Sequence, residues 1–486
     1  MPGGDASARG SSERVAVLAG ALVGIAFLAL FRTTRSELLD GDGTSLVERL
    51  AEADTGIALW YQAAYLVLGR AVEAFVGIGR SLDALLWVSA ASGAAALALC
   101  AALGVRRQGA FAGLVPALAL ASSPGLWLNA TRVEVHATQA AGAAFALVLG
   151  TALRTGRAWS TFALAALLQF VASTSHNSQH GMAFGVAWLV ARGSSARRGS
   201  FAAGAGVAVG LAGALLANSS SNPTSPEMGV AYLFTLVRNW FTGPSLAFSV
   251  DEFVLPWCPV LGLVLLVRRE DLRRVAPVAV AVLPSLFFFL AYGIRSEGGY
   301  FATFAVGATV AATLASRRPA GVRRNVVALV VAALSVLGLV RSVDALRDRA
   351  RDPLGGLGAA RAAIAAEVLP DGGYYVRLDL EGQTVSGRVR HLHEIDAARM
   401  ISEILVHHLA FERFEAAVEG RIAGAAATGL PIAIDRTWTI AAAVDTRIGP
   451  FMEEFERAVG RHYDTELVES GGVPYLVGTP RATVSR

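Results

Sequence analysis

Residues 83–104 read DALLWVSAASGAAALALCAALG, and the pair Arg106-Arg107 follows shortly after them. Asp83 is the only charged residue of the stretch. A run of this length and hydropathy can cross a bilayer as one α-helix, which takes about 20 residues. Ten further apolar runs of spanning or near-spanning length lie at 15–31, 110–128, 136–153, 160–175, 181–192, 201–217, 253–267, 275–294, 300–316 and 324–341. The sequence therefore predicts a polytopic α-helical membrane protein with about eleven transmembrane helices.

The overall composition agrees with this class. Of the 486 residues, 54% are hydrophobic and 16% are charged, whereas soluble domains carry about 25% charged residues. A mean hydropathy of +0.51 excludes an ordinary soluble enzyme and a disordered protein. Cys100 and Cys258 both lie in apolar stretches, which excludes a disulfide scaffold. The net charge of +4 resembles a nucleic-acid signal. However, the arginine pairs lie between hydrophobic segments, so membrane topology explains them better and no nucleic-acid partner is expected.

Arginine placement predicts the orientation in the membrane. Clusters follow every second apolar segment, at Arg9/Arg14, Arg106/Arg107, Arg154/Arg157, Arg192/Arg197/Arg198, Arg268/Arg269/Arg273/Arg274 and Arg317/Arg318/Arg323/Arg324. The intervening short connections hold few positive charges, such as Arg132 and Arg295. Positive charge accumulates in cytoplasmic loops. We therefore expect a multi-pass protein of the inner (plasma) membrane with a cytoplasmic N-terminus and an extracytoplasmic C-terminus.

Two long loops are expected on the outer face of a transmembrane domain spanning 1–341. The first, 32–82, contains a mixed segment at 46–79 that is too charged to span easily and is typical of amphipathic helices at the membrane surface. The second, 218–250, contains aromatic residues that suit the membrane interface. Anchoring alone and a role in binding membrane lipids explain these aromatic residues equally well.

From residue 342 the composition changes. Residues 342–486 hold 21 of the 38 acidic residues, and their apolar runs are short. Strands are expected at 374–380, 431–435, 463–468 and 473–477, and helices at 359–369, 395–425, with a break near Gly420, and 450–460. Alternating strands and helices predict a small extracytoplasmic α/β domain.

Ionisable residues near the membrane are costly and are therefore candidates for function. On the predicted topology, four connections bring such residues to the outer face: Asp40 and Asp42, Glu134 and His136, His176 and His180, and Arg295 with Glu297. A carboxylate there could accept a proton from an incoming hydroxyl or hold a metal. This convergence on one face is the strongest functional signal in the sequence.

Each candidate also has a purely structural explanation. Asp40-Gly-Asp42-Gly can form a turn or cap a helix near Thr44. Glu134 can complement a helix dipole. His176 and His180 are four residues apart, a spacing that can place two metal ligands on one helix face. The pairs His391/His393 and His407/His408 are expected at the surface of the C-terminal domain.

Short motifs in the first part of the chain resemble the GT-C membrane glycosyltransferases. Within that class, the branch related to transmembrane protein O-mannosyltransferases is most similar. The matching stretches are Asp42-Gly-Thr-Ser-Leu46, LVLGR at 66–70, Glu134-Val135-His136, where the family usually has Tyr in place of His, and His176 in Ser-His-Asn. These matches cover roughly residues 15–190. Residues 55–60, TGIALW, depart from the His-Pro-Pro-Gly-like motif of related sequences.

The resemblance implies an inverting sugar transferase. Its donor would be a polyprenyl-phosphate-linked sugar, and its acceptor an extracytoplasmic lipid, glycan or protein. Asp42 would be the general base, with Asp40 as the alternative. Glu134 and His136 would position the acceptor, with His180 beside them, and His176 would hydrogen-bond the donor phosphate. Arg238 or Arg295 would neutralise that phosphate, and a divalent cation (Mg or Mn), if one is used, would be held by Asp42 and Glu134.

Two other function classes stay open on the sequence. A transporter or flippase usually shows two similar halves and broken helices near the midplane. Neither internal symmetry nor charges in mid-helix are evident here. A non-enzymatic sensor or assembly protein, using its outer domain to bind a partner, agrees with the departure at residues 55–60.

Overall fold

The computed structural model describes most of the hydrophobic part of the chain and much of the C-terminal part. The described residues are 4–35, 46, 50, 63–77, 80–219, 255–292, 301–315, 322–351, 367–371, 373–376, 389–391, 411–436, 449–470 and 473–481. The chain divides into two compact units. The first is helical and consists of 1–37, 46–223 and 236–350. The second consists of 38–45, 224–235 and 351–486.

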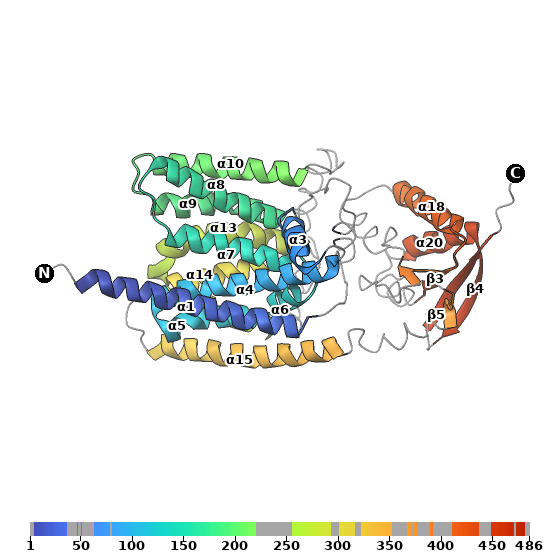
Figure 1. Cartoon of the computed structure of the whole chain (residues 1–486), viewed down its shortest axis with the longest axis horizontal. Helices are drawn as coiled ribbons and strands as arrows, with labels where there is room; N and C mark the ends of the chain where they lie inside the picture. The colour runs from blue at the N-terminus through green and yellow to red at the C-terminus, as the bar shows by residue number, and fades with distance from the viewer. Residues whose placement is uncertain are drawn as a thin grey trace. The chain divides into compact units, whose positions relative to one another are not determined.

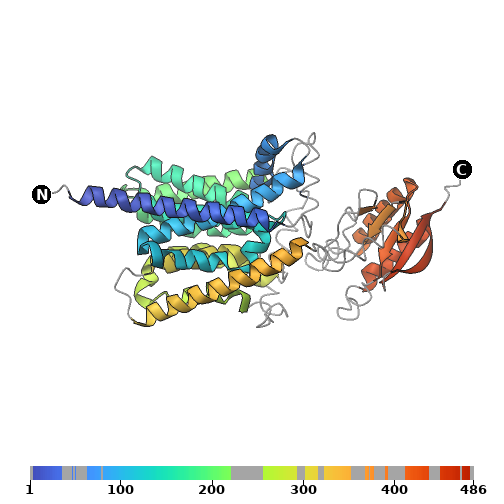
Figure 2. The same cartoon turned by 60° about the horizontal axis from the view of Figure 1, so that its bottom comes forward.

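In the first unit most of the long helices run side by side along a common direction, whereas the short α3 lies across them (Figures 1 and 2). The bounds are α1 (Gly4–Thr33), α3 (Ala63–Val76), α4 (Ser81–Gln108), α5 (Ala110–Ala121), α6 (Pro124–Thr131), α7 (His136–Ala152), α8 (Ala158–Ser175), the 3₁₀ helix η1 (Asn177–Met182), α9 (Ala183–Gly193), α10 (Gly199–Ser219), α12 (Leu255–Val264), the 3₁₀ helix η4 (Arg269–Asp271), α13 (Leu272–Tyr292), α14 (Ala302–Leu314) and α15 (Val322–Arg351). Each of the eleven predicted apolar segments contains a helix, which confirms the predicted fold class.

Among the described residues, four helices are both long and apolar enough to cross a membrane: Ser12–Thr33, Ser81–Gln108, Ala158–Ser175 and Gly199–Ala217. A fifth candidate is the pair α5 and α6, which meet at a bend of 68°. The sequence predicted one spanning segment over 110–128, and in the structure this segment is bent where α5 meets α6. Pro124 disfavours helical geometry at the residue before it, and Ser123 is extended (φ −74°, ψ 130°).

Small residues bring the helix backbones close together. A Cβ atom on Gly206 of α10 would lie 2.3 Å from the carbonyl oxygen of Phe162 in α8, and one on Gly210 would lie 2.3 Å from that of Ala166. The same holds between α4 and α5, where a Cβ on Gly104 would lie 2.0 Å from the carbonyl oxygen of Gly113. Close approach at small residues is the usual way in which helices pack inside membranes. Gly104, Gly206 and Gly210 are thus required for the close approach of these helices.

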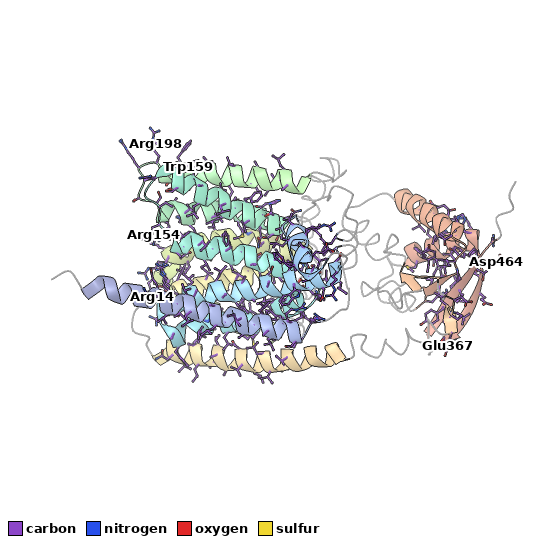
Figure 3. All side chains as sticks on the ribbon, viewed as in Figure 1. Arg14, Arg154, Trp159, Arg198, Glu367 and Asp464 are labelled. Atoms are coloured by element: carbon purple, nitrogen blue, oxygen red, sulfur yellow. The ribbon has the colours of Figure 1, made fainter. Side chains whose placement is uncertain are left out.

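The two ends of the helical unit differ in chemistry. Arginines gather at the end where α1, α8, α10 and α13 begin and where α4, α7 and α9 finish, and we call this the arginine end. Arg14, Arg154 and Arg198 mark it in Figure 3. The opposite end, where α7 begins and α8 finishes, carries His136 and His176. We call it the histidine end.

The second unit contains a mixed five-stranded sheet in the order β2-β1-β3-β5-β4. The strands are β1 (Gly373–Val376), β2 (Val389–His391), β3 (Ile432–Asp435), β4 (Tyr463–Ser470) and β5 (Val473–Pro480). The pairs β1/β2 and β1/β3 are parallel, whereas β3/β5 and β4/β5 are antiparallel, with Ile434 opposite Leu476. Two helices, α18 (Phe411–Ala427) and α20 (Gly449–His462), contribute Val418 and Phe455 to the buried core.

This unit matches the small α/β domain expected from the sequence, with two corrections. Helix α18 continues through Gly420, so the expected break there was wrong. Strand β2 was not predicted, because its three residues are too few to show a hydrophobic period. It contains His391, which was expected at the surface, while His393, His407, His408 and most of the expected helix at 359–369 lie outside the described residues.

Candidate functional site

Three chain connections meet at the histidine end. Helix α7 begins at His136, α8 finishes at Ser175, and α14 begins at Ala302. The rings of His136 and His176 are 5.3 Å apart between centroids and tilted by 41°. Both residues are 4% exposed. The structure thus brings together two of the sequence candidates from connections that are forty residues apart along the chain.

His136 is held by a fixed hydrogen bond. Its Nδ1 is 2.6 Å from Oε1 of Gln139, one turn further along α7. The amide nitrogen of Gln139 donates to Thr303 Oγ1 at 2.9 Å and Ser178 Oγ at 3.1 Å, so its oxygen faces the ring. An amide oxygen only accepts, and Nδ1 of His136 therefore carries a proton.

Glu134 stands beside the second nitrogen of this ring. The distance from His136 Nε2 to Glu134 Oε1 is 3.9 Å. The same oxygen accepts the backbone N–H of Val135 at 2.8 Å, at the start of α7. Glu134 is 8% exposed. The carboxylate therefore complements the helix N-terminus, as the structural explanation required, and also faces the histidine pair.

His176 has the opposite arrangement of protons. Its Nδ1 accepts the backbone N–H of Ser178 at 3.1 Å and lies 2.8 Å from the hydroxyl of the same residue. A nitrogen that accepts a backbone N–H carries no proton, so the neutral ring has its proton on Nε2. His176 follows the last residue of α8, outside the spanning helix. Burial lowers its pKa well below 6.5, and the neighbouring His136 and His180 lower it further.

His180 lies in η1, and burial lowers its pKa to about 4. Its buried Nδ1 has no hydrogen-bond partner among the described residues. The spacing of His176 and His180 could place both on one helix face, but the structure does not form that arrangement. His176 ends α8 in an extended conformation (φ −168°, ψ 141°), so no α-helical turn connects the two residues.

An amide network connects the site to α14. The amide nitrogen of Gln179 donates to the carbonyl oxygen of Gln139 at 2.6 Å and to Thr303 Oγ1 at 3.0 Å. Sequence reasoning missed Gln139, Gln179 and Thr303. One signal was present in the sequence, because Gln139 is a polar residue three positions after His136 on an otherwise apolar helix.

Helix α3, within the predicted first outer loop, is fixed to the same end. The hydroxyl of Tyr65 is 2.8 Å from Ser89 Oγ of α4. The hydroxyl of Ser89 in turn donates to the carbonyl oxygen of Glu134 at 3.4 Å. Burial raises the pKa of Tyr65. At the end of α1, Arg35 donates to Asp83 at 3.1 Å, close to the start of α4.

The described residues do not form a metal site by themselves. His136 Nε2 and Glu134 Oε1 could contribute two ligands from 3.9 Å apart. Within the described part of the chain, no group of three His, Cys, Asp or Glu side chains is placed to hold a metal ion. The remaining sequence candidates, Asp40, Asp42, Arg238 and Arg295, lie outside the described residues.

Comparison with known proteins gives a match in structure only. No family model matches the chain, and no curated protein matches it in sequence. Two crystal structures of ArnT from Cupriavidus metallidurans superpose on it with 13% sequence identity, covering 94% of this chain and 97% of ArnT. The TM-score is 0.52 for ArnT bound to undecaprenyl phosphate and 0.51 for the apo state. The fold is similar to that of ArnT.

The ArnT-like fold confirms the predicted architecture, a polytopic helical membrane protein with a small C-terminal domain. At 13% identity, the likeness to ArnT establishes the fold and leaves the activity to be argued from the site.

Proposed function

We propose that the protein is a membrane glycosyltransferase that transfers a sugar from a polyprenyl-phosphate donor to an extracytoplasmic acceptor. One observation carries the proposal. The ArnT-like fold extends over 94% of the chain, and a buried cluster of Glu134, His136 and His176 lies at one end of its helices. An ArnT crystal structure is bound to undecaprenyl phosphate, which is the kind of lipid phosphate that the proposed donor would release.

In the proposed reaction the acceptor hydroxyl attacks the anomeric carbon of the donor sugar. Asp42 removes the hydroxyl proton, the bond between that carbon and the phosphate oxygen breaks, and the polyprenyl phosphate leaves with the electron pair. Asp40 is the alternative base. The choice of these aspartates rests on the sequence motif at 42–46.

The neutral His176 suits the donor phosphate. The hydrogen-bond pattern at Nδ1 leaves the proton on Nε2, so the ring can donate to a phosphate oxygen. Stabilising the charge of the leaving group in a water-poor site lowers the barrier directly. Arg238 or Arg295 would add a guanidinium group to the same phosphate.

Glu134 and His136 would position the acceptor hydroxyl, with His180 completing the polar wall. His136 fits this role because its Nδ1 proton is committed to Gln139, so that in the neutral ring Nε2 can accept a hydrogen bond. A divalent cation, if the reaction uses one, would be bound by Glu134 together with Asp42. No step of the proposed reaction depends on it.

We place the arginine end in the cytoplasm and the histidine end outside, in the plasma membrane, with a domain boundary at 341/342. The gathering of short-loop arginines at one end supports this orientation. We expect a topology reporter fused after residue 345 to be found on the extracytoplasmic side of the membrane. A fused reporter that is found in the cytoplasm would contradict the orientation. The narrower relation to protein O-mannosyltransferases rests on the sequence motifs alone.

The direct test offers radiolabelled polyprenyl-phosphate sugars and candidate acceptors to the full-length protein in nanodiscs. Asp42→Asn should lower the rate of transfer at least 100-fold, because a positioned general base contributes roughly 10²–10⁴-fold. Asp54→Asn, a carboxylate of the same predicted loop, is the matched control. If Asp42→Asn and Asp40→Asn both retain wild-type transfer, the assignment of the base is wrong.

A further inference from the structure

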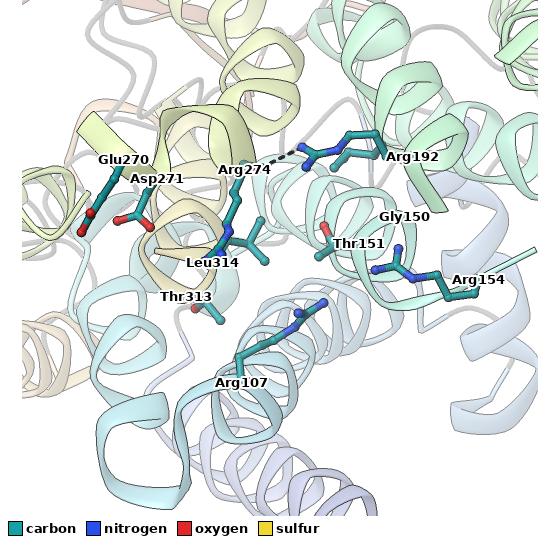
Figure 4. A pocket seen from close by; sticks show the side chains of 11 residues that line it. Arg107, Gly150, Thr151, Arg154, Arg192, Glu270, Asp271, Arg274, Thr313 and Leu314 are labelled. Atoms are coloured by element: carbon teal, nitrogen blue, oxygen red, sulfur yellow. Dashed lines mark hydrogen bonds between the residues drawn. The ribbon is translucent and has the colours of Figure 1, made fainter. Parts of the chain in front are cut away.

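A cavity of about 550 Å³ opens at the arginine end of the helical unit (Figure 4). The ends of α4, α7, α9 and α14 and the start of α13 surround it. Thr151 in its wall is fifteen residues along α7 from His136. At 1.5 Å per residue this separation is about 22 Å. The cavity is therefore distinct from the histidine cluster.

Four arginines line the cavity: Arg107, Arg154, Arg192 and Arg274. Figure 4 shows them around Thr151, each from a different helix end. Arg192 donates through Nη1 to the backbone carbonyl oxygens of Arg273 and Arg274, at 2.8 and 3.4 Å. A carbonyl oxygen does not neutralise a guanidinium group, so this contact fixes the position of the side chain and leaves its charge in place.

Two acidic residues, Glu270 and Asp271, also line the cavity, next to Arg268, which is not part of its wall. Glu270 lies 3.5 Å from the guanidinium of Arg268, and Asp271 Oδ2 accepts the backbone N–H of Arg268 at 3.3 Å. Figure 4 shows both carboxylates on the far side of the cavity from Arg154. The side nearest Arg154 and Arg192 is therefore positive.

Thr151 gives evidence for a ligand in the cavity that is independent of the arginines. This residue is 8% exposed and lines the cavity. Its buried Oγ1 has no hydrogen-bond partner among the described residues. Buried hydroxyl groups are nearly always hydrogen-bonded in folded proteins. An acceptor oxygen from a ligand in the cavity would satisfy it.

We propose that this cavity is a binding site for a phosphate-bearing anion, contacted by the guanidinium groups of Arg154 and Arg192 and the hydroxyl of Thr151. The planar fork of a guanidinium matches two phosphate oxygens. The volume exceeds that of a single phosphate and lies within the range of small-molecule sites, about 300–1,000 Å³. Leu189 and Leu314 add apolar wall. A glycerophosphate group has this chemistry, and it can come from an anionic lipid headgroup or from a soluble phosphate compound.

The test measures binding rather than sugar transfer, so it is independent of the proposed enzymatic activity. Full-length protein is purified in neutral detergent and stripped of lipid. It is then titrated with phosphatidylglycerol or phosphatidylcholine by native mass spectrometry, and with inorganic phosphate by calorimetry. We expect a clear preference for phosphatidylglycerol, or measurable phosphate binding. The double variant Arg154→Gln/Arg192→Gln should weaken this binding roughly tenfold or more, since hydrogen bonds to charged groups are strong.

Matched variants separate binding from folding. Arg198→Gln, an exposed arginine of the same end outside the cavity wall, should bind as the wild type does. Thr151→Val keeps the side-chain shape without the hydroxyl and should weaken binding, whereas Thr151→Ser should retain it. This pair leaves all four arginines intact and still tests the site if the double variant folds poorly.

The two sources of the phosphate group give different results. Phosphate binding without a preference for phosphatidylglycerol assigns the site to soluble phosphate compounds, whereas a preference for phosphatidylglycerol that excess phosphate does not displace assigns it to a headgroup. The proposal is overturned if Thr151→Val and the double variant bind both probes as tightly as Arg198→Gln does. It is equally overturned if the wild type shows no phosphate binding and no preference for the anionic lipid.

Discussion

The imidazole rings of His136 and His176 face each other at 5.3 Å with protons on different nitrogens. His136 is protonated on Nδ1 by its contact with Gln139, and His176 accepts at Nδ1 from Ser178. In their neutral forms the two rings thus offer an acceptor and a donor, respectively, at their Nε2 atoms. A site that must hold both a hydroxyl group and a phosphate oxygen needs this pair of opposite functions.

If His176 donates to the donor phosphate, its replacement should affect donor binding first. His176→Phe removes the Nε2 proton donor, and we expect the KM for the lipid-linked donor to rise about 10- to 100-fold, as for the loss of a hydrogen bond to a charged group. His176→Gln keeps an N–H donor and should recover part of the loss. Steady-state kinetics with varied donor provide the measurement. Equal donor KM values for both variants and the wild type would contradict the role.

Acidification should destabilise the protein through His180. Its pKa is about 4 in the folded state and 6.5 in the unfolded state. Between these values the unfolded chain binds more protons, so the unfolding free energy falls as the pH drops from 6.5 to 4. The full effect is on the order of 3 kcal/mol.

His180→Gln should flatten this dependence. The measurement is the melting temperature in detergent at pH 7 and pH 5, and the loss on acidification should be smaller in the variant. His176 shifts in the same direction, so part of the dependence will remain. Parallel pH profiles for the wild type and His180→Gln would show that His180 is not the titrating group.

The close contact between α10 and α8 can be tested with two glycines of one helix. Gly210→Ala would force a methyl group to within 2.3 Å of the carbonyl oxygen of Ala166. We expect a loss of about 1–3 kcal/mol and a lower melting temperature. Gly204→Ala, which meets nothing within 4 Å, should be neutral or stabilising by up to about 1 kcal/mol. The same melting temperature for both variants would contradict the close approach of α10 to α8.

The unpartnered hydroxyl of Thr151 predicts an unusual response to a conservative substitution. In lipid-free protein, Thr151→Val should leave stability unchanged or raise it by about 1 kcal/mol, because it removes a buried polar group that has no partner among the described residues. Thr161→Val is the contrast, since Thr161 is bonded to Thr155 and Ser194 at 2.8 Å each, and it should lose about 1–3 kcal/mol. Thermal unfolding of both variants decides between these outcomes.

Hydropathy sufficed to predict the helices, because the thickness of the bilayer fixes the length of an apolar run. Local rules were less reliable at the ends of elements. Helix α5 ends shortly before Pro124, and α6 begins at Pro124 in a different direction, although the apolar run is continuous. Hydropathy alone does not show such a bend. Strand β2 is three residues long and depends on pairing with β1 instead of on its own pattern.

The candidate site was predictable in its ionisable members and not in its neutral ones. Glu134, His136 and His176 stand out because charge and imidazole are rare near a membrane. Gln139 and Thr303 do not, because amides and hydroxyls inside helices commonly bond to their own backbone. Their significance depends on a tertiary contact between residues 164 positions apart. The four-residue spacing of His176 and His180 likewise does not determine their geometry, since the backbone turns between them.

The contacts of Thr303 with Gln139 and Gln179 have a consequence for biosynthesis. The chain emerges from the ribosome N-terminus first, so α7 and η1 enter the membrane more than a hundred residues before α14 is made. During that interval both glutamine amides lack the hydroxyl partner they have in the finished protein. We therefore expect the early helices to keep these amide groups only partly satisfied until α14 is inserted. Nascent chains arrested before residue 301 should stay associated with the insertion machinery for longer than chains that include α14.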